Sequence, residues 1–144
     1  MPAGSHEPTP PAGHREPSIA EILAREFFAA IDQRDPRRLQ ATLAEHATFR
    51  ALPHAAPVRP ADEIVAYFGA VVSSYPEARW EVSDVIATED RAAVQFVVRE
   101  YSPRLGRELI SEQIAVFRVA NDKIVSIVGY YDTAEFRRLF WEEA

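Results

Sequence analysis

The sequence NDKIVSIVGYYD, residues 121–132, is the most informative part of this chain. A polar turn leads into an almost wholly apolar strand, which ends in two tyrosines and the carboxylate of Asp132 just before a predicted helix. A carboxylate at the end of a strand that can be buried on both faces is costly unless it is paired, caps a helix or takes part in chemistry. The role of Asp132 is therefore the central question that the sequence raises.

Three segments before this strand have the same character. They are rich in valine, isoleucine and aromatic residues, a composition typical of β-strands, and they span 80–88, 92–101 and 108–119, with the fourth strand at 124–131. Only short polar turns separate the four segments. Links this short between consecutive strands predict an antiparallel meander.

The first half of the chain is predicted to be mainly helical. Ser18 and Glu21 have the spacing of a capping box, and apolar residues then recur at helical spacing as far as Ile31. The pair Asp35-Pro36 supplies an N-cap and a proline at the first helical position. It predicts a short second helix that ends near residue 45.

The remaining elements complete an α+β pattern. A short strand is expected at 47–52, followed by a proline-rich loop, a third helix from about 60 to 75, and a last helix that begins at 132 or 133. The predicted order is α-α-β-α-β-β-β-β-α, which is an α+β arrangement. Residues 1–17, with five prolines and no periodicity, are expected to form a disordered tail that precedes one domain over 18–144.

Composition excludes several classes of function. The net charge of -6 argues against a nucleic-acid partner, because nothing supplies a surface that neutralises phosphates. No apolar run approaches the length needed to span a bilayer, so no membrane segment is expected. The chain has no cysteine, which excludes disulfides and thiolate chemistry and fits a cytoplasmic location. We expect neither a metal site nor a cofactor, because the phosphate-binding and metal-binding motifs are absent.

The order and spacing of short phrases resemble the SnoaL-like, polyketide cyclase-like branch of the nuclear transport factor 2-like superfamily. These phrases are Asp35-Pro36, Tyr75-Pro76-Glu77, Val116-Phe117-Arg118-Val119, Asn121-Asp122-Lys123-Ile124 and Tyr130-Tyr131-Asp132. The resemblance implies a cone-shaped fold, in which a strongly curved sheet wraps around the N-terminal helices and encloses an apolar pocket. It also implies a homodimer that is formed through the outer face of the sheet.

The same resemblance implies that Asp132 is the acid or base of the site. Its spacing from Glu135 is also that of a capping box, so a role as the cap of the last helix stays open. Strand alternation places Tyr130 on the face of Asp132, where it either donates to an oxyanion or only packs.

Five further side chains are candidates for binding a substrate. Gln113 lies in an otherwise apolar strand and either enters the pocket or faces solvent. Arg50 could bind a carboxylate, and His54, in the proline-rich loop, either shuttles protons or is merely exposed. Tyr67 and Trp80 belong to the aromatic interior and are expected to contact the ligand.

Two functions remain open. The first is a cofactor-free enzyme of secondary metabolism that binds a hydrophobic, carbonyl-bearing molecule and catalyses cyclisation, isomerisation or dehydration by proton transfer. The second is a non-catalytic ligand-binding or dimerisation module of the same fold, since fold alone does not decide function. The first strand carries His46-Ala47-Thr48-Phe49-Arg50 where an isomerase-like acid is expected, and this favours the second.

Overall fold

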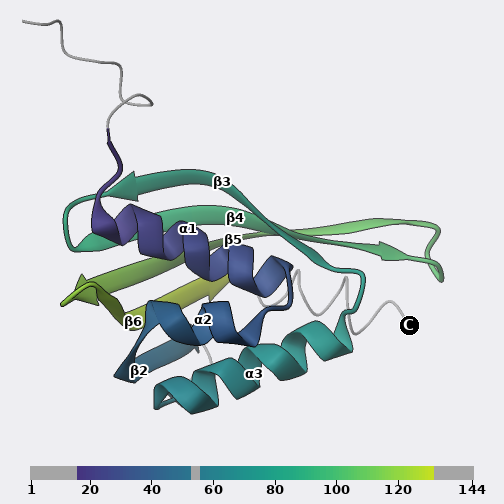
Figure 1. Ribbon diagram of the computed structural model, residues 1–144. Helices are drawn as coiled ribbons and strands as arrows, with labels where there is room; N and C mark the ends of the chain where they lie inside the picture. Colours follow the sequence, from purple (N-terminus) through teal and green to yellow (C-terminus); the bar gives the residue numbers. More distant parts are fainter. Residues whose placement is uncertain (1–15, 53–55, 132–144) are drawn as a thin grey trace, which may run out of the picture.

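In the part of the chain that the structure describes, five strands form one sheet, and three helices cover one of its faces (Figure 1). The computed structural model describes residues 16–52 and 56–131. The helices are α1 (Ile19–Asp32), α2 (Pro36–Thr42) and α3 (Ala61–Ser74), and the strands are β2 (Leu43–Leu52), β3 (Arg79–Ala87), β4 (Arg91–Ser102), β5 (Arg107–Ala120) and β6 (Lys123–Tyr131). The predicted α+β class is confirmed, whereas the tail and the predicted last helix lie outside the described residues.

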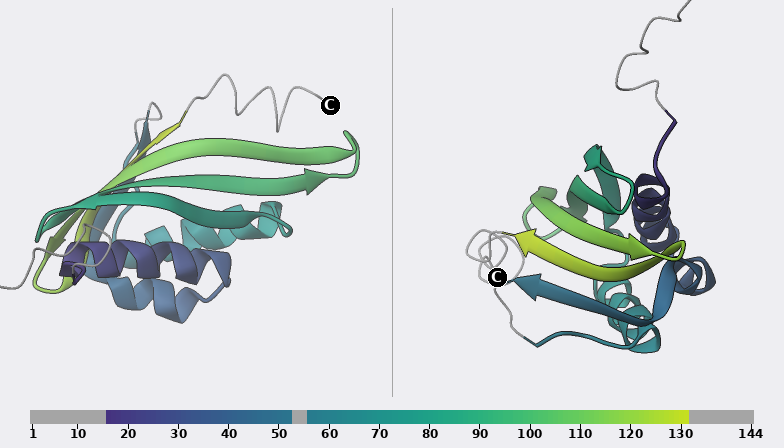
Figure 2. Two further views of the ribbon diagram at one scale, coloured as in Figure 1. Left: turned by 90° about the horizontal axis from the view of Figure 1, so that it is seen from above. Right: turned by 90° about the vertical axis from the view of Figure 1, so that its left-hand side faces the viewer.

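The sheet has the strand order β2-β6-β5-β4-β3. Strands β3 to β6 pair antiparallel with their neighbours in sequence, which confirms the predicted meander. The first strand, β2, runs parallel to β6 and closes the other edge. Figure 2 shows how strongly the sheet curves, with the helices inside the curve.

Local capping explains where the first two helices begin. The hydroxyl of Ser18 accepts a hydrogen bond of 3.2 Å from the amide of Glu21, as predicted, but the Glu21 carboxylate pairs with Arg25 instead of completing the box. Asp35 caps α2 by accepting from the amide of Arg38 at 3.1 Å, and Pro36 follows at the first helical position.

The end of α1 is a Schellman motif. The amide of Asp35 donates to the carbonyl of Ala30 at 2.9 Å, and the amide of Arg34 donates to that of Ile31 at 3.0 Å. Arg34 therefore occupies the left-handed position of the motif, with φ of 55°. Glycine is the usual residue there, because a Cβ atom in this conformation costs about 1 kcal/mol.

The second helix is shorter than the sequence predicts. It ends at Thr42, and residues 43–45, which were expected to be helical, begin β2. Leu43 is extended, with φ of -102° and ψ of 138°, and pairs with Ile124 of β6. Pairing with the sheet and burial of Leu43 outweigh the helical preference of this Leu-Ala-Glu sequence.

A β-bulge in β6 decides which side chains of this strand face the helices. Ile124 pairs with Val119 of β5, yet Ser126 pairs with Arg118, so Val125 is an extra residue on β6. The bulge reverses the alternation after Ile124. As a result Ile127 is buried beneath the helices, and the face that Tyr130 shares with Val128 is the outer one.

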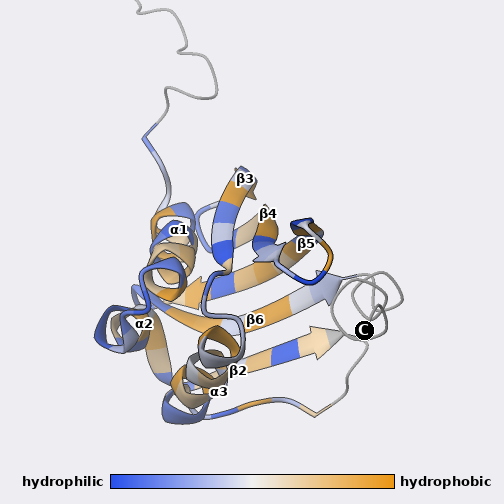
Figure 3. Cartoon of the chain, turned by 90° about the vertical axis from the view of Figure 1, so that its right-hand side faces the viewer, coloured by the Kyte–Doolittle hydropathy of each residue, from blue (hydrophilic) through white to orange (hydrophobic). Residues whose placement is uncertain are grey.

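The core lies between the concave face of the sheet and the helices, and its centre is aromatic. Phe27 of α1 makes edge-to-face contacts with Phe28, Phe68 and Phe117, with ring centroids 5.3, 5.4 and 5.3 Å apart. Hydrophobic and hydrophilic residues alternate along the strands around this core (Figure 3). The packing of these rings fixes the helices on the sheet and leaves a cavity beside them.

Candidate functional site

A cavity of about 320 Å³ lies between the concave face of the sheet and the helices α1 and α3. Most of its wall is apolar, and half of the residues that form it are aromatic. The aromatic lining residues are Phe27, Phe28, Phe49, Tyr67, Phe68, Tyr75, Trp80, Phe96 and Tyr131. A concave, mostly apolar site with a few polar groups is the usual form of a small-molecule pocket.

Glu100 is the only acid among the described residues that line this cavity, and none of those residues is basic. It follows Phe96 and Val98 along β4, and the alternation of the strand directs all three to the inside. Burial raises the pKa of the Glu100 carboxyl above its ordinary value, against a hydrogen bond from the amide of Glu77 and the positive charge of Arg34, which both lower it. The carboxylate of Glu77 adds to the rise in this pKa.

The raised pKa has a consequence for stability. In the pH range between the ordinary and the raised pKa of Glu100, the folded protein holds a proton that the unfolded chain has lost. The free energy of unfolding therefore falls as the pH rises through this range. A carboxyl that is costly to ionise is also suited to proton transfer nearer neutral pH.

Three tyrosines supply hydroxyl groups to the same cavity. Burial raises the pKa of Tyr67, and the electrostatic influence of Tyr131 raises it further. Burial likewise raises the pKa of Tyr131, with a smaller contribution from Tyr75. The phenols of Tyr67 and Tyr131 therefore stay protonated at neutral pH and can donate hydrogen bonds to a ligand.

Gln113 places a neutral amide on the β5 side of the cavity. It pairs in register with Phe96 of β4 and with Tyr131 of β6. Its side-chain nitrogen donates to the hydroxyl of the buried Ser111 at 3.2 Å. This bond fixes one end of the amide and aims the group at the cavity rather than at solvent.

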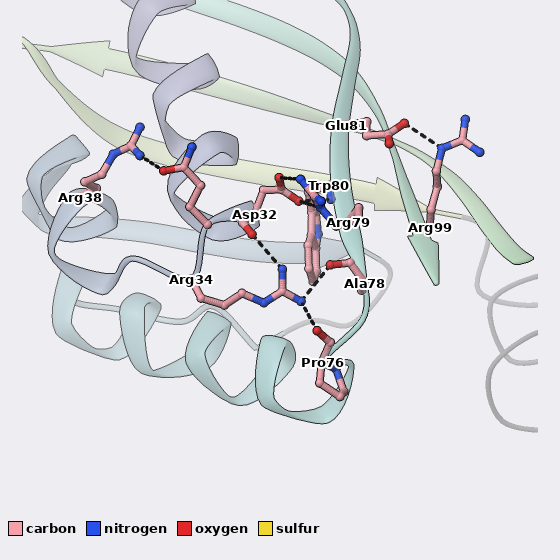
Figure 4. A network of polar contacts seen from close by, with 10 residues as sticks. Asp32, Arg34, Arg38, Pro76, Ala78, Arg79, Trp80, Glu81 and Arg99 are labelled. Carbon is pink, nitrogen blue, oxygen red and sulfur yellow. Dashed lines mark hydrogen bonds and ion pairs between the residues drawn. The ribbon is translucent and has the colours of Figure 1, made fainter. Parts of the chain in front are cut away.

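An ion-pair network supports the opposite wall of the cavity (Figure 4). The carboxylate of Asp32 accepts two hydrogen bonds from the guanidinium of Arg79, at 2.8 and 2.6 Å, and one from the amide of Trp80 at 2.9 Å. The bonds from Arg79 are the main reason that the pKa of Asp32 lies below its ordinary value. The network fixes the start of β3, where the indole of Trp80 lines the cavity.

Three of the predicted binding residues line the cavity, and two lie outside it. Tyr67, Trp80 and Gln113 all line the cavity, and their contact with a ligand stays a prediction. Tyr130 does not line it and is 43% exposed, because the bulge at residue 125 turns it to the outer face. Arg50 is also outside the cavity, since its neighbours Phe49 and Ala51 take the inward positions on β2.

The other two predicted site residues, Asp132 and His54, lie outside the described residues. Sequence reasoning also missed three polar residues of the cavity, Glu100, Tyr75 and Tyr131. For Glu100 the signal was present, because it continues the alternation of Phe96 and Val98 on β4. For Tyr131 no such signal existed, because the bulge reverses the alternation that the sequence suggests.

Within residues 16–52 and 56–131, no three potential ligands of the His, Cys, Asp and Glu types gather where they could hold a metal ion. None of the helices in this part of the chain is long and apolar enough to cross a membrane. The polar side chains that line the described cavity are one carboxyl, three phenols, one amide and the indole of Trp80.

The chain belongs to the family of SnoaL-like domains, because the model of that family matches residues 24–127. This match confirms the resemblance inferred from the sequence. No curated protein matches the chain.

Solved structures show the same nuclear transport factor 2-like fold. One is a protein of unknown function from Burkholderia pseudomallei, 24% identical, which covers 87% of this chain and 99% of its own with a TM-score of 0.74. A putative SnoaL-like polyketide cyclase from Jannaschia is 12% identical, with coverage of 89% and 96% and a TM-score of 0.76. TerC, co-crystallised with polyporic acid, is 15% identical, with coverage of 85% and 98% and a TM-score of 0.72.

Proposed function

We propose that this protein is a cofactor-free enzyme that binds a hydrophobic, carbonyl-bearing small molecule and catalyses a proton transfer of the cyclase, isomerase or dehydratase type. The observation that carries the proposal is an aromatic cavity of about 320 Å³ with one carboxyl of raised pKa on its wall. The cavity is large enough for a small organic molecule. The absence of basic residues from its described lining favours a neutral ligand over an anion.

The proposed step is an exchange of protons at the carbon next to the carbonyl. The ionised Glu100 carboxylate would take a proton from this carbon, and the electrons of the broken C–H bond would move to form an enolate. A tyrosine hydroxyl of the cavity would donate a hydrogen bond to the developing oxyanion. The proton then returns from Glu100 to the same carbon, or to the far carbon of a dienolate where the carbonyl is conjugated with a double bond, so that the enzyme is unchanged.

Relatives support this choice of chemistry at the level of the fold. The similar structure from Jannaschia is described as a putative polyketide cyclase, and TerC was crystallised with polyporic acid. The sequence resemblance assigns the acid or base to Asp132 instead, and that assignment remains the competing proposal for the identity of the proton carrier.

A non-catalytic ligand-binding module is the second candidate, and one contact favours it. The carboxylate of Glu100 accepts a hydrogen bond from the amide of Glu77, so this acid can also serve to anchor the segment that follows α3. In that case the protein binds a ligand in the cavity but catalyses no proton transfer. An assay of proton exchange separates the two candidates.

We expect a side chain that fills the cavity to abolish binding without unfolding the protein. A Cβ atom at Gly129 would meet only the Phe49 ring, at 3.9 Å, so the Gly129→Leu side chain would extend into the cavity. With Trp141 replaced by phenylalanine, Trp80 is the only indole and its fluorescence reports binding of methyl naphthyl ketone. The affinity of Gly129→Leu for this ketone should fall by about tenfold or more.

Gly69→Leu is the matched control for this measurement. It adds the same atoms on α3, where a Cβ meets nothing within 4 Å, and Gly69 does not line the cavity. Its affinity should equal that of the parent protein. Equal binding by the Gly129→Leu variant, with a melting temperature like that of the parent, would mean that the ligand does not occupy this cavity.

We also infer a homodimer formed through the outer face of the sheet. This face carries apolar side chains that the helices do not cover, among them Val97, Ile110, Ile114 and Val128. Covering such a face removes apolar surface from water.

Light scattering should give twice the mass of the chain for the parent protein. The Ile110→Lys variant should give the mass of a monomer. A monomeric parent protein would refute the inference of a homodimer.

A further inference from the structure

We propose that Arg34 is a positioning residue of the site: its side chain holds the segment 75–80 in place and thereby sets the shape of the cavity and the environment of Glu100. The ligand-binding part of this inference rests on the proposed function. The structural part, which concerns the segment and Glu100, can be tested without any ligand.

The guanidinium of Arg34 donates to three backbone carbonyls of this segment, and Figure 4 shows two of these bonds, to Pro76 and Ala78. One nitrogen, Nη2, donates to the carbonyls of Tyr75, Pro76 and Ala78 at 3.2, 3.0 and 2.8 Å. The other, Nη1, donates to the carbonyl of Asp32 at 2.8 Å and so ties the group to the end of α1. Residues 75–78 precede the ladder of β3, which begins at Arg79, so these charge-assisted bonds add to the backbone bonds from Tyr75 to Val71 and from Ala78 to Tyr75.

The same group lies on the face of Trp80. The Cζ atom of Arg34 is 5.5 Å from the centroid of the indole ring, a distance typical of a cation–π contact. Three of the residues that the fork and this stacking hold, Tyr75, Ala78 and Trp80, line the cavity. Arg34 itself does not line it. Its effect on a ligand would therefore pass through the wall that it holds.

The backbone conformation at residue 34 indicates that the arginine side chain itself is needed at this position. The residue has φ of 55° at the left-handed position of the Schellman motif, where glycine is the favoured residue. An arginine there strains the backbone, and a purely structural role in ending α1 would be met better by glycine. Lysine could not replace it, because the single nitrogen of an ammonium cannot bind the Asp32 carbonyl and the segment from two sides of a planar group that also stacks on Trp80.

Arg34 also acts on the acid of the cavity. Its positive charge lowers the pKa of Glu100, and the segment that it holds presents the amide of Glu77 to the same carboxylate. The Glu77 carboxylate and burial act in the opposite direction. Removal of the Arg34 side chain would thus remove its charge and loosen the Glu77 amide, the two influences that lower the pKa of Glu100.

Arg34→Gly tests this inference, because it removes the fork while giving the backbone its favoured residue. The variant should stay folded, with the circular dichroism of the parent, while the Trp80 fluorescence shifts and the pKa of Glu100, followed by carboxyl NMR, rises. Its affinity for methyl naphthyl ketone should fall by about tenfold. Arg34→Lys keeps the charge but not the fork, so it should restore part of the Glu100 pKa and little of the affinity.

Arg25→Gln is the control for the loss of one positive charge, since Arg25 pairs with Glu21 on the exposed side of α1. It should change none of the readouts. The inference is overturned if Arg34→Gly, or Arg34→Lys should the glycine variant not fold, leaves the Trp80 fluorescence and the Glu100 titration as in the parent. If the parent protein binds no ketone, the proposed function is wrong, and the two ligand-free readouts still decide the role of Arg34.

Discussion

Replacement of Glu100 by glutamine should lower the rate at which the protein exchanges the methyl protons of methyl naphthyl ketone for deuterium by about two to four orders of magnitude. Glutamine keeps the size of the side chain and can still accept the hydrogen bond from the Glu77 amide, but it cannot carry a proton. The exchange is followed by proton NMR in heavy water. This assay needs no knowledge of the natural substrate.

Two further variants give this result its meaning. Glu89→Gln changes the same residue type in the exposed link between β3 and β4, away from the cavity, and should leave the exchange rate unchanged. Asp132→Asn tests the competing proposal from the sequence resemblance. If Asp132→Asn abolishes exchange while Glu100→Gln does not, the proton carrier is Asp132; if the parent protein accelerates no exchange, the binding module is the better description.

The second large effect concerns the fold. Phe117→Ala should lower the free energy of unfolding by about 3–5 kcal/mol, measured by urea denaturation. The ring of Phe117 is 0% exposed and contacts Phe27 and Phe28 edge to face, with centroids 5.3 and 5.7 Å away. Alanine would leave a void where α1 packs on the sheet. Because Phe117 does not line the ligand cavity, the loss reports on packing alone.

Arg118→Ala, the next residue, is the control for this prediction. Arg118 lies on the exposed face of β5, so its truncation should change the free energy of unfolding by no more than about 0.5 kcal/mol. Domains of this size have only about 5–15 kcal/mol of stability, so Phe117→Leu provides a milder variant if the alanine protein does not fold. Equal stabilities of Phe117→Leu and the parent, together with a small loss in Phe117→Ala, would contradict the packing described for the core.

Much of the fold could be predicted from the sequence because its signals are local. Short polar turns between valine-rich segments predict the meander β3 to β6, and Ser18 and Asp35 predict the helix starts that the structure confirms. The predicted end of α2 was wrong, because Leu43 pairs with β6, a strand about eighty residues away along the chain. Pairing over such a distance leaves no mark in a window of ten residues.

The site was predicted less well than the fold, mainly because of one bulge in β6. The extra residue at Val125 reverses the faces of β6, so alternation from Ile124 pointed to Tyr130 when Tyr131 is the one that lines the cavity. A bulge is a feature of strand pairing, and the sequence of one strand does not reveal it. Glu100 was overlooked because charged residues in strands more often face water.

The pH at which Glu100 ionises decides whether the cavity holds an acid that is suited to proton transfer. The carboxyl carbon of Glu100 can be followed by NMR as the pH is varied in the ligand-free protein, and the spectrum of Glu100→Gln assigns its signal. Because burial outweighs the Glu77 amide and the charge of Arg34, the carboxyl should titrate above the ordinary glutamate pKa of 4.5. A pKa at or below this value would show a solvated or anchored carboxylate and would remove the acid on which the proposed chemistry depends.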